Sequence, residues 1–149
     1  MLSEEQRIKM LKVPEGYIDM VLDTDAYNEI DDQFAISYAM KAEKLNVKAI
    51  YAAPFFNDRS SSPADGMEKS YREILKLLDL AKLSAVVFRG SDRYLPDEKT
   101  PVSSPAAEDL VKRAMDYTPE KPLYVVAIGA ITNIASALLI KPEIADRIV

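Results

Sequence analysis

Short apolar runs alternate with longer segments of helical periodicity along most of this chain. The runs are rich in Val, Ile and aromatic residues, and they predict strands at residues 18–22, 47–53, 85–88 and 123–128. Strands that alternate with helices pair in parallel, because a right-handed crossover helix packs back onto one face of the sheet. The sequence therefore predicts an α/β fold with a mostly parallel open sheet flanked by helices.

Three of the intervening segments carry apolar residues at the spacing of one helix face. The first stripe comprises Phe34, Ala35, Tyr38, Ala42 and Leu45; the second comprises Met67, Tyr71, Ile74, Leu75 and Leu78; the third comprises Ala107, Leu110, Val111, Ala114 and Met115. Ser104 and Pro105 predict where the third helix begins. A fourth helix is predicted from Thr132 or Asn133 through Leu139.

The composition narrows the classes of function. The chain has 149 residues, of which 48% are hydrophobic and 29% charged, and this predicts one globular domain. A formal charge of -5 argues against nucleic acid and anionic membranes as partners. The chain has no Cys and no His, which excludes disulfides, thiolate or imidazole metal sites and His-based catalytic triads.

The first twelve residues carry charges throughout and lack an apolar core, so they do not resemble a secretory signal. This favours a cytoplasmic location. Ser3 and Gln6 form a capping-box pattern, which predicts a short leading helix that ends before Pro14 and Gly16.

Residues 122–140 are 19 consecutive uncharged residues, about the length that crosses a bilayer. Gly129, Thr132, Asn133 and Ser136 interrupt the apolar character of this run near its middle. A buried strand, a tight turn and a capped helix are therefore predicted here in preference to a membrane span.

Five carboxylates lie within the ten residues 23–32, directly after the first predicted strand, and no Lys or Arg lies among them. Like charges this close repel, so a bound cation, raised pKa values or full exposure to water must offset them. In parallel sheets, ligands bind beyond the carboxyl ends of the strands, where this cluster is expected. The alternative is that Asp31 and Asp32 only complement a helix N-terminus while Asp23 and Glu29 are solvated.

A hard divalent cation takes carboxylate and carbonyl oxygens as ligands. Asp25 and Asp32 are separated by a turn that can fold back, so both side chains could reach one ion. An EF-hand fits poorly, because Asn28 stands where that loop needs glycine and Phe34 where it needs glutamate. A metal held in this way could activate a water molecule whose proton passes to a nearby carboxylate.

Several segments resemble one enzyme family, the nucleoside hydrolases of the inosine-uridine-preferring type. Residues 23–25 (DTD) and 31–35 (DDQFA) resemble the N-terminal signature of that family, DxDxGxDDxxA. Residues 125–135 resemble its second segment, a strand that leads into G-x-x-T-N-[IL]-A. Asn57, after the second strand, and residues 142–144 also fit. The resemblance implies the Rossmann-like nucleoside hydrolase fold and extends from Ile18 onward.

The resemblance also implies an activity: hydrolysis of the N-glycosidic bond of ribonucleosides to free base and ribose, as in purine and pyrimidine salvage. Members of the family use a tightly held calcium ion, Ca²⁺, which binds the attacking water and the ribose diol. A small-molecule ribonucleoside is thus the implied partner, while base preference and homo-oligomerisation stay undefined. By position, the resemblance makes Asp25 the catalytic base; Asp25, Asp32 and the carbonyl of Ile128 the metal ligands; Asp31 and Asn57 the ribose-binding residues; and Asp23 a residue that orients the loop.

The chain departs from the family pattern in two local features. The loop between Asp25 and Asp31 is two residues longer than in the usual signature, so Glu29 could add a ligand or shift Asp25. Residues 54–56 are Pro-Phe-Phe, which is bulkier than the small residues that usually precede the asparagine equivalent to Asn57.

The remaining metal-binding aspartate of the family, and a histidine that assists departure of the base in many members, belong to its C-terminal half. Residues 142–149 look like the approach to another buried strand. We therefore expect residues 1–149 to be a single α/β domain that forms the N-terminal part of a longer nucleoside-hydrolase-like domain, with an incomplete active site.

Two other functions remain open at this point. In a haloacid-dehalogenase-like phosphatase the first strand also ends in Asp-x-Asp, but Tyr27 stands where that family has Thr or Val. A non-catalytic homologue that binds a nucleoside or sugar would keep the fold after the longer loop had abolished the chemistry.

Overall fold

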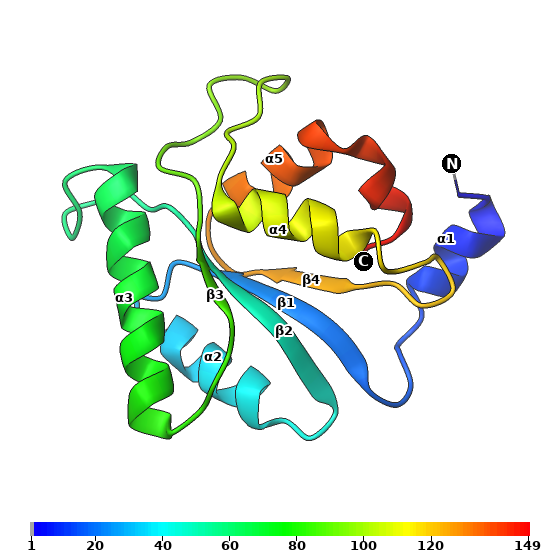
Figure 1. The fold of residues 1–149 in the computed structure, drawn as a ribbon, viewed down its shortest axis with the longest axis horizontal. Helices are drawn as coiled ribbons and strands as arrows, with labels where there is room; N and C mark the ends of the chain where they lie inside the picture. The colour runs from blue at the N-terminus through cyan, green and yellow to red at the C-terminus, as the bar shows by residue number, and fades with distance from the viewer. Residues whose placement is uncertain (1) are drawn as a thin grey trace.

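The computed structural model describes residues 2–149 and centres on a four-stranded sheet in which every paired strand is parallel (Figure 1). Its strands are β1 (Ile18–Thr24), β2 (Leu45–Ala52), β3 (Val87–Arg89) and β4 (Tyr124–Ala127), in the spatial order β3-β2-β1-β4. The predicted α/β class and parallel sheet are thus confirmed. Because β1 lies inside the sheet, its carboxyl end is flanked by the ends of β2 and β4.

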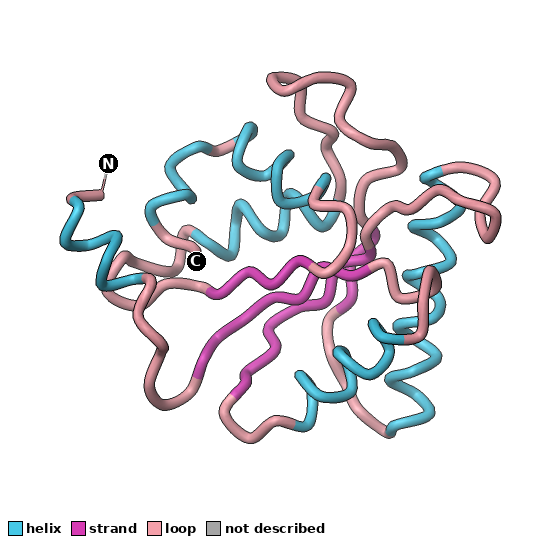
Figure 2. The backbone as a smooth tube through the Cα atoms, turned by 180° about the vertical axis from the view of Figure 1, so that it is seen from behind, coloured by secondary structure: helices cyan, strands magenta, loops and turns pink. Residues whose placement is uncertain are grey.

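The helices are α1 (Glu4–Met10), α2 (Asp31–Lys41), α3 (Pro63–Ala81), α4 (Pro105–Ala114) and α5 (Thr132–Ile140), and a 3-10 helix, η1, follows at Pro142–Asp146. Helices α2 and α3 cover one face of the sheet, and α4 and α5 cover the other (Figures 1 and 2). This is the two-sided cover expected of right-handed crossovers in a parallel sheet.

Alternation along β1 supplies both hydrophobic cores. Val21 packs with Tyr51 and Leu110 on the α4–α5 side, whereas Leu22 packs with Ile36 on the α2–α3 side. Each fully buried side chain of this size stabilises the fold by about 1.5–3 kcal/mol relative to its exposed state. Strand β1 is therefore held from both faces, which fixes the position of the residues at its end.

The helix starts follow the capping chemistry of the sequence. Helix α1 begins with the predicted capping box between Ser3 and Gln6. The Ser104 hydroxyl accepts a hydrogen bond from the backbone N–H of Ala107, and Pro105 is the first residue of α4, as predicted. Helix α3 begins in the same way, with Ser62 as its cap.

Helix α2 presents a different face to the core than its apolar stripe predicted. Phe34 and Tyr38 are 69% and 73% exposed, whereas Asp32, Ile36 and Ala39 are buried. Asp32 accepts a hydrogen bond from Thr24 at the end of β1, and Ile36, one turn further along the same face, packs in the core, so these two contacts together turn this face toward the sheet. The prediction that the Phe34–Tyr38 stripe forms the buried face was therefore wrong.

The long uncharged run divides as predicted into β4, a turn and α5. Within the described residues, none of the helices has the length and apolar character needed to cross a membrane.

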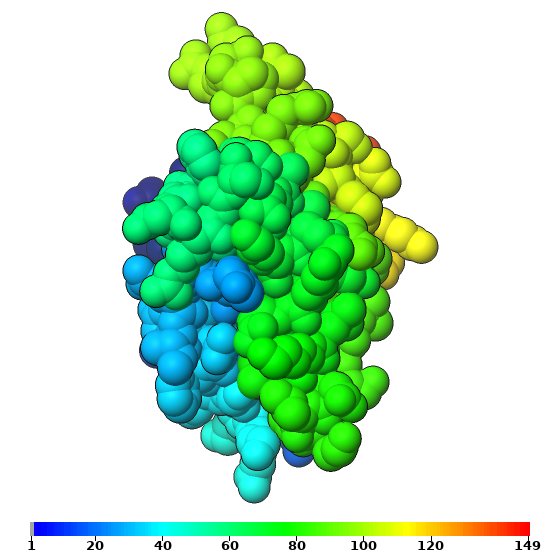
Figure 3. Space-filling view, turned by 90° about the vertical axis from the view of Figure 1, so that its left-hand side faces the viewer, coloured from blue at the N-terminus to red at the C-terminus, as the bar shows by residue number. Residues whose placement is uncertain are grey.

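Beyond η1 the chain returns to β4. The N–H of Val125 donates to the carbonyl of Val149 at 2.7 Å, and the N–H of Val149 donates to the carbonyl of Leu123 at 3.0 Å. The segment between β3 and α4, residues 90–104, projects from the body of the molecule (Figures 1 and 3).

Candidate active site

The carboxyl ends of three strands meet at one edge of the sheet. Asp23 in β1 is in register with Tyr51 of β2 and Ala127 of β4. Two backbone hydrogen bonds extend this alignment beyond the strands: Ala53 N–H donates to the Thr24 carbonyl at 2.8 Å, and Ile128 N–H donates to the Asp23 carbonyl at 2.9 Å. The residues that follow each strand are thereby gathered around Asp25.

Strand β1 continues two residues beyond its predicted end, through Asp23 and Thr24, and both side chains are fully buried. A polar side chain pays a desolvation penalty in such a position unless it is hydrogen-bonded. Thr24 donates to Asp32, and Asp23 accepts from the side-chain amide of Asn133 at 2.8 Å. The strand therefore ends in polar residues whose partners come from α2 and α5.

Asp25 is buried, with 7% of its surface exposed, and its two carboxylate oxygens have different neighbours. Oδ2 accepts a hydrogen bond from Nδ2 of Asn28 at 3.1 Å. Oδ1 lies against Gly129, where an added Cβ atom would stand only 2.7 Å away. Glycine is therefore required at position 129 if Asp25 is to keep this position.

Asp32 is 5% exposed in the first turn of α2. Burial raises the pKa of Asp32 to about 6, and the nearby charge of Asp25 adds to this rise. Burial likewise raises the pKa of Asp25 above its ordinary value, with the charges of Asp31 and Glu29 contributing. Buried carboxylates with raised pKa values are typical of functional sites and would be stabilised in the charged form by a cation.

Asp23 belongs to a polar network centred on Asn133, the asparagine of the T-N pair. The Asn133 amide donates to Asp23 and to the Ala52 carbonyl, while its oxygen accepts from the backbone and the hydroxyl of Ser91 and from the hydroxyl of Ser104. One side chain thus joins β1, β2, α4 and the segment after β3. In the sequence, only the T-N motif indicated a role for Asn133, and no pattern indicated one for Ser91.

Burial raises the pKa of Asp23 to about 7, the Asn133 hydrogen bond opposes this rise, and the charge of Asp25 adds to it. Oδ1 of Asp23 is buried and lacks a hydrogen-bond partner within the described part of the chain. This oxygen is a buried acceptor that the fold leaves unsatisfied.

The other predicted site residues lie at the rim. Asp31 and Asn57 are exposed, and the side chain of Ile128 is 39% exposed. Asn57 connects to the centre through Asn28, since its Nδ2 donates to Asn28 Oδ1 at 2.6 Å. Glu29, considered as an added ligand, is exposed on the loop, whereas Asn28 contacts Asp25. The sequence did not single out Asn28 for this position.

The donor atoms at this edge are oxygens, which is the ligand type that Ca²⁺ takes. Across residues 2–149, however, no group of three or more His, Cys, Asp or Glu side chains is arranged to hold a metal ion. A calcium shell usually has about six to eight oxygens, so Asp25 and Asp32 would supply only part of it.

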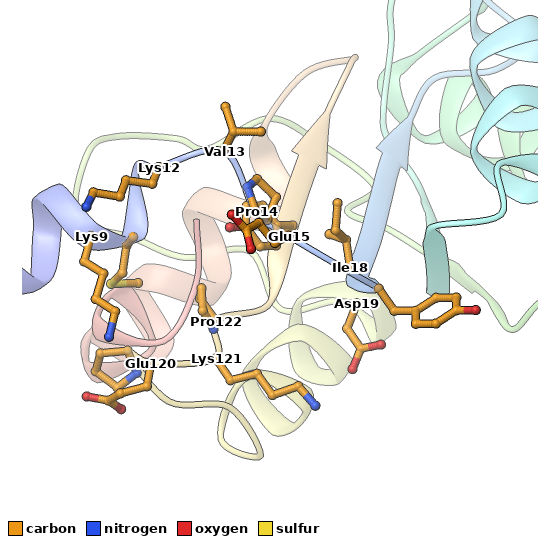
Figure 4. Close-up of a pocket in the computed structure, with 14 residues that line it drawn as sticks. Lys9, Lys12, Val13, Pro14, Glu15, Ile18, Asp19, Glu120, Lys121 and Pro122 are labelled. Atoms are coloured by element: carbon orange, nitrogen blue, oxygen red, sulfur yellow. The ribbon is translucent and has the colours of Figure 1, made fainter.

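A cavity of about 330 Å³ lies at the other end of β1, where Ile18, Asp19 and Pro122 line it together with Lys9 and Glu120 (Figure 4). A strand rises about 3.3 Å per residue, so the distance from Asp19 to Asp25 is roughly 20 Å. This cavity is therefore separate from the carboxylate edge.

Known structures share the fold. A plant nucleoside hydrolase is 21% identical and aligns over 88% of this chain and 45% of its own, with a TM-score of 0.61. A purine-preferring ribonucleoside hydrolase from Gardnerella vaginalis is 24% identical over 87% and 46%, with a TM-score of 0.66. An inosine-guanosine nucleoside hydrolase is 23% identical over 86% and 43%, with a TM-score of 0.63. The chain thus spans less than half the length of these structures.

No curated protein gives a significant match to the sequence. The family model described as inosine-uridine preferring nucleoside hydrolase, in contrast, matches residues 20–149, which include β1, the carboxylate cluster and the Gly129–Asn133 segment. Together with the shared fold, this match shows that the chain belongs to the inosine-uridine preferring nucleoside hydrolase family.

Proposed function

We propose that this chain forms the N-terminal part of an enzyme that hydrolyses the N-glycosidic bond of ribonucleosides to free base and ribose. The observation that carries the proposal is the pair of buried carboxylates, Asp25 and Asp32, at the carboxyl edge of β1 in a chain of this family. Two acids with raised pKa values at this edge are costly for a purely structural role and useful for holding a cation and a proton.

Asp25 is the proposed catalytic base and, with Asp32 and the carbonyl oxygen of Ile128, a proposed ligand of Ca²⁺. When bound, calcium would lower the pKa of the attacking water, and this is the chemistry that the metal contributes. Asp25 would accept the proton of that water, for which its raised pKa is suited. Thr24 holds Asp32 in place through its hydroxyl.

Asp31 and Asn57 are the proposed partners of the ribose hydroxyls. Asp31 is exposed at the start of α2, and Asn57 lies on the loop after β2. The Asn57 amide oxygen already accepts from the backbone of Arg59 at 2.9 Å, and one N–H is engaged by Asn28, so the other N–H can serve a ligand. Anchored hydroxyls would stabilise the distorted ring of an oxocarbenium-like transition state.

The complete active site needs groups beyond those of residues 1–149. We propose that these residues form a single α/β domain that is the N-terminal part of a longer nucleoside-hydrolase-like domain. The longer polypeptide would supply the remaining metal ligand and the group that assists departure of the base. The coverage of less than half of each related structure supports this arrangement.

A non-catalytic nucleoside-binding protein is the second candidate. One observation favours it: among residues 2–149, no group of three or more His, Cys, Asp or Glu side chains is arranged to hold a metal ion. The phosphatase alternative has no comparable support, since the family model that matches is that of the nucleoside hydrolases.

The test uses the complete protein and release of ribose from inosine and uridine. Asp25→Asn should abolish ribose release and weaken calcium binding. Asp19→Asn is the matched control, because it makes the same substitution in the same strand at the opposite edge of the sheet. Normal turnover by Asp25→Asn would refute the assignment, and nucleoside binding without hydrolysis by the unaltered protein would favour the second candidate.

A further inference from the structure

Asn28 lies where the longer loop returns toward the end of β1. Its backbone N–H donates to the Asp25 carbonyl at 2.7 Å, which closes a four-residue turn over residues 25–28. Two features of the loop thus fix Asn28: this turn, and the Lys69 ammonium, which stands 5.8 Å from the ring centroid of Tyr27 and connects the loop to α3. The Asn28 side chain is therefore presented by an anchored backbone.

The Asn28 side chain connects two residues that come from different strands. It donates through Nδ2 to Oδ2 of Asp25 at 3.1 Å, and its Oδ1 accepts from Nδ2 of Asn57 at 2.6 Å. Asp25 follows β1, and Asn57 follows β2. Asn28 uses its donor toward the carboxylate and its acceptor toward the amide, so the polarity of both contacts is matched.

Asn28 belongs to the part of the loop that departs from the usual family signature. Five residues separate Asp25 from Asp31, two more than in DxDxGxDD. Asn28 lies within these five residues. The extension therefore adds a contact between two proposed site residues.

We propose that Asn28 is a positioning residue that holds the Asp25 carboxylate and the Asn57 amide in a fixed relative orientation. This inference rests on the proposed function, in which Asp25 accepts a proton and Asn57 binds a ribose hydroxyl. A hydrogen bond to one carboxylate oxygen restricts rotation of the group and leaves Oδ1, on the Gly129 side, for other partners. Partners of this kind typically change activity by about 10–100-fold when they are removed.

Two substitutions in the complete protein separate the two contacts. Asn28→Ala removes both, so kcat should fall and KM should rise, with a combined loss in kcat/KM of about 10–100-fold. Asn28→Asp has nearly the same shape and keeps an acceptor for Asn57 but loses the donor to Asp25. It should therefore lower kcat while raising KM less than Asn28→Ala does.

Asn46→Ala is the matched control. Asn46 also donates its side-chain amide to a carboxylate, Asp19 Oδ1 at 2.6 Å, but at the opposite end of the sheet. A purely structural role for Asn28 would change the thermal midpoint without the difference in KM between the two Asn28 variants. If both variants keep the kcat and KM of Asn46→Ala, the positioning role is wrong while the hydrolase assignment stands. If the unaltered protein releases no ribose, both proposals fail.

Discussion

The hydroxyl of Thr24, the last residue of β1, donates a hydrogen bond to the carboxylate of Asp32 in the first turn of α2. Both residues are buried, so this bond joins the central strand to the helix away from solvent. The Asp32 face of α2 also carries Ile36, which packs in the core, whereas Phe34 and Tyr38 are exposed. The buried face of this crossover helix thus combines a polar contact at the candidate site with apolar packing.

The Thr24→Val substitution removes this donor and keeps the shape of the side chain. Asp32 would then be a buried carboxylate without its partner, which costs about 1–3 kcal/mol. We expect urea denaturation at neutral pH to show a loss of this size in the free energy of unfolding. Thr118→Val, in the turn between α4 and β4, should change it by less than about 0.5 kcal/mol. An equal effect of the two substitutions would show that the Thr24 bond is not important for stability.

The raised pKa values predict that the metal-free chain loses stability as pH increases. Asp32 and Asp23 have folded-state pKa values of about 6 and about 7, above the ordinary value of 3.8. Between these values the folded chain binds protons that the unfolded chain has released, so the free energy of unfolding falls as pH rises. The contribution of Asp23 and Asp32 to the free energy of unfolding is fully present below their unfolded-state pKa. It is lost once the pH rises above their folded-state pKa values.

Chemical denaturation of EDTA-treated protein from pH 4 to pH 8 measures this trend. Asp23→Asn removes one of the two titrating groups and should flatten the upper part of the curve. Excess calcium should reduce the slope, because a cation stabilises the ionised carboxylates. A free energy of unfolding that increases from pH 5 to pH 7.5 in EDTA would contradict the burial of Asp23 and Asp32.

Gly129→Ala tests the close approach of the glycine to Asp25. The added Cβ would stand 2.7 Å from Oδ1 of Asp25, closer than two such atoms can pack, so the carboxylate must move. In the complete protein we expect ribose release to fall at least about 10-fold, together with about 1–3 kcal/mol of overpacking cost. Ala130→Gly, at the next position, is the control for chain flexibility, and full activity of Gly129→Ala would disprove the steric argument.

Asn133→Ala tests the network that joins the strand ends. The substitution leaves the Asp23 carboxylate, the Ala52 carbonyl and the Ser91 groups without their shared partner. We expect a loss of more than about 2 kcal/mol in the free energy of unfolding, because each unsatisfied buried group costs about 1–3 kcal/mol. Asn46→Ala removes an exposed hydrogen bond and should be nearly neutral. Similar losses for the two variants would argue against the network.

The sequence predicted the order of strands and helices because β-branched runs and capping residues were distinct along the chain. It placed the end of β1 too early, at Leu22, since Asp23 and Thr24 are polar and yet buried in the strand. Their partners, Asn133 and Asp32, lie 110 and eight positions away in sequence, and local patterns carry no signal for such pairs. Local rules fail where polar residues are buried, as they are at the candidate site.

The candidate site was predictable to a similar extent. The spacing of Asp25 and Asp32 suggested that one turn brings them to the same edge, and the structure places both there in buried positions. The position of Asn28 depends on how a five-residue loop folds, and this loop has no Gly or Pro to define its turn. The sequence pointed to Glu29 as an added ligand, whereas the structure places Glu29 exposed on the loop and Asn28 against Asp25.

The most direct test of the central claim is ribose release by the complete protein before and after removal of calcium. Inosine and uridine are supplied to the untreated enzyme, to the chelated enzyme, and to the chelated enzyme with calcium restored. The proposed function predicts release by the first, none by the second and recovery in the third. Ribose release that persists undiminished after chelation, or no release from any sample, would contradict it.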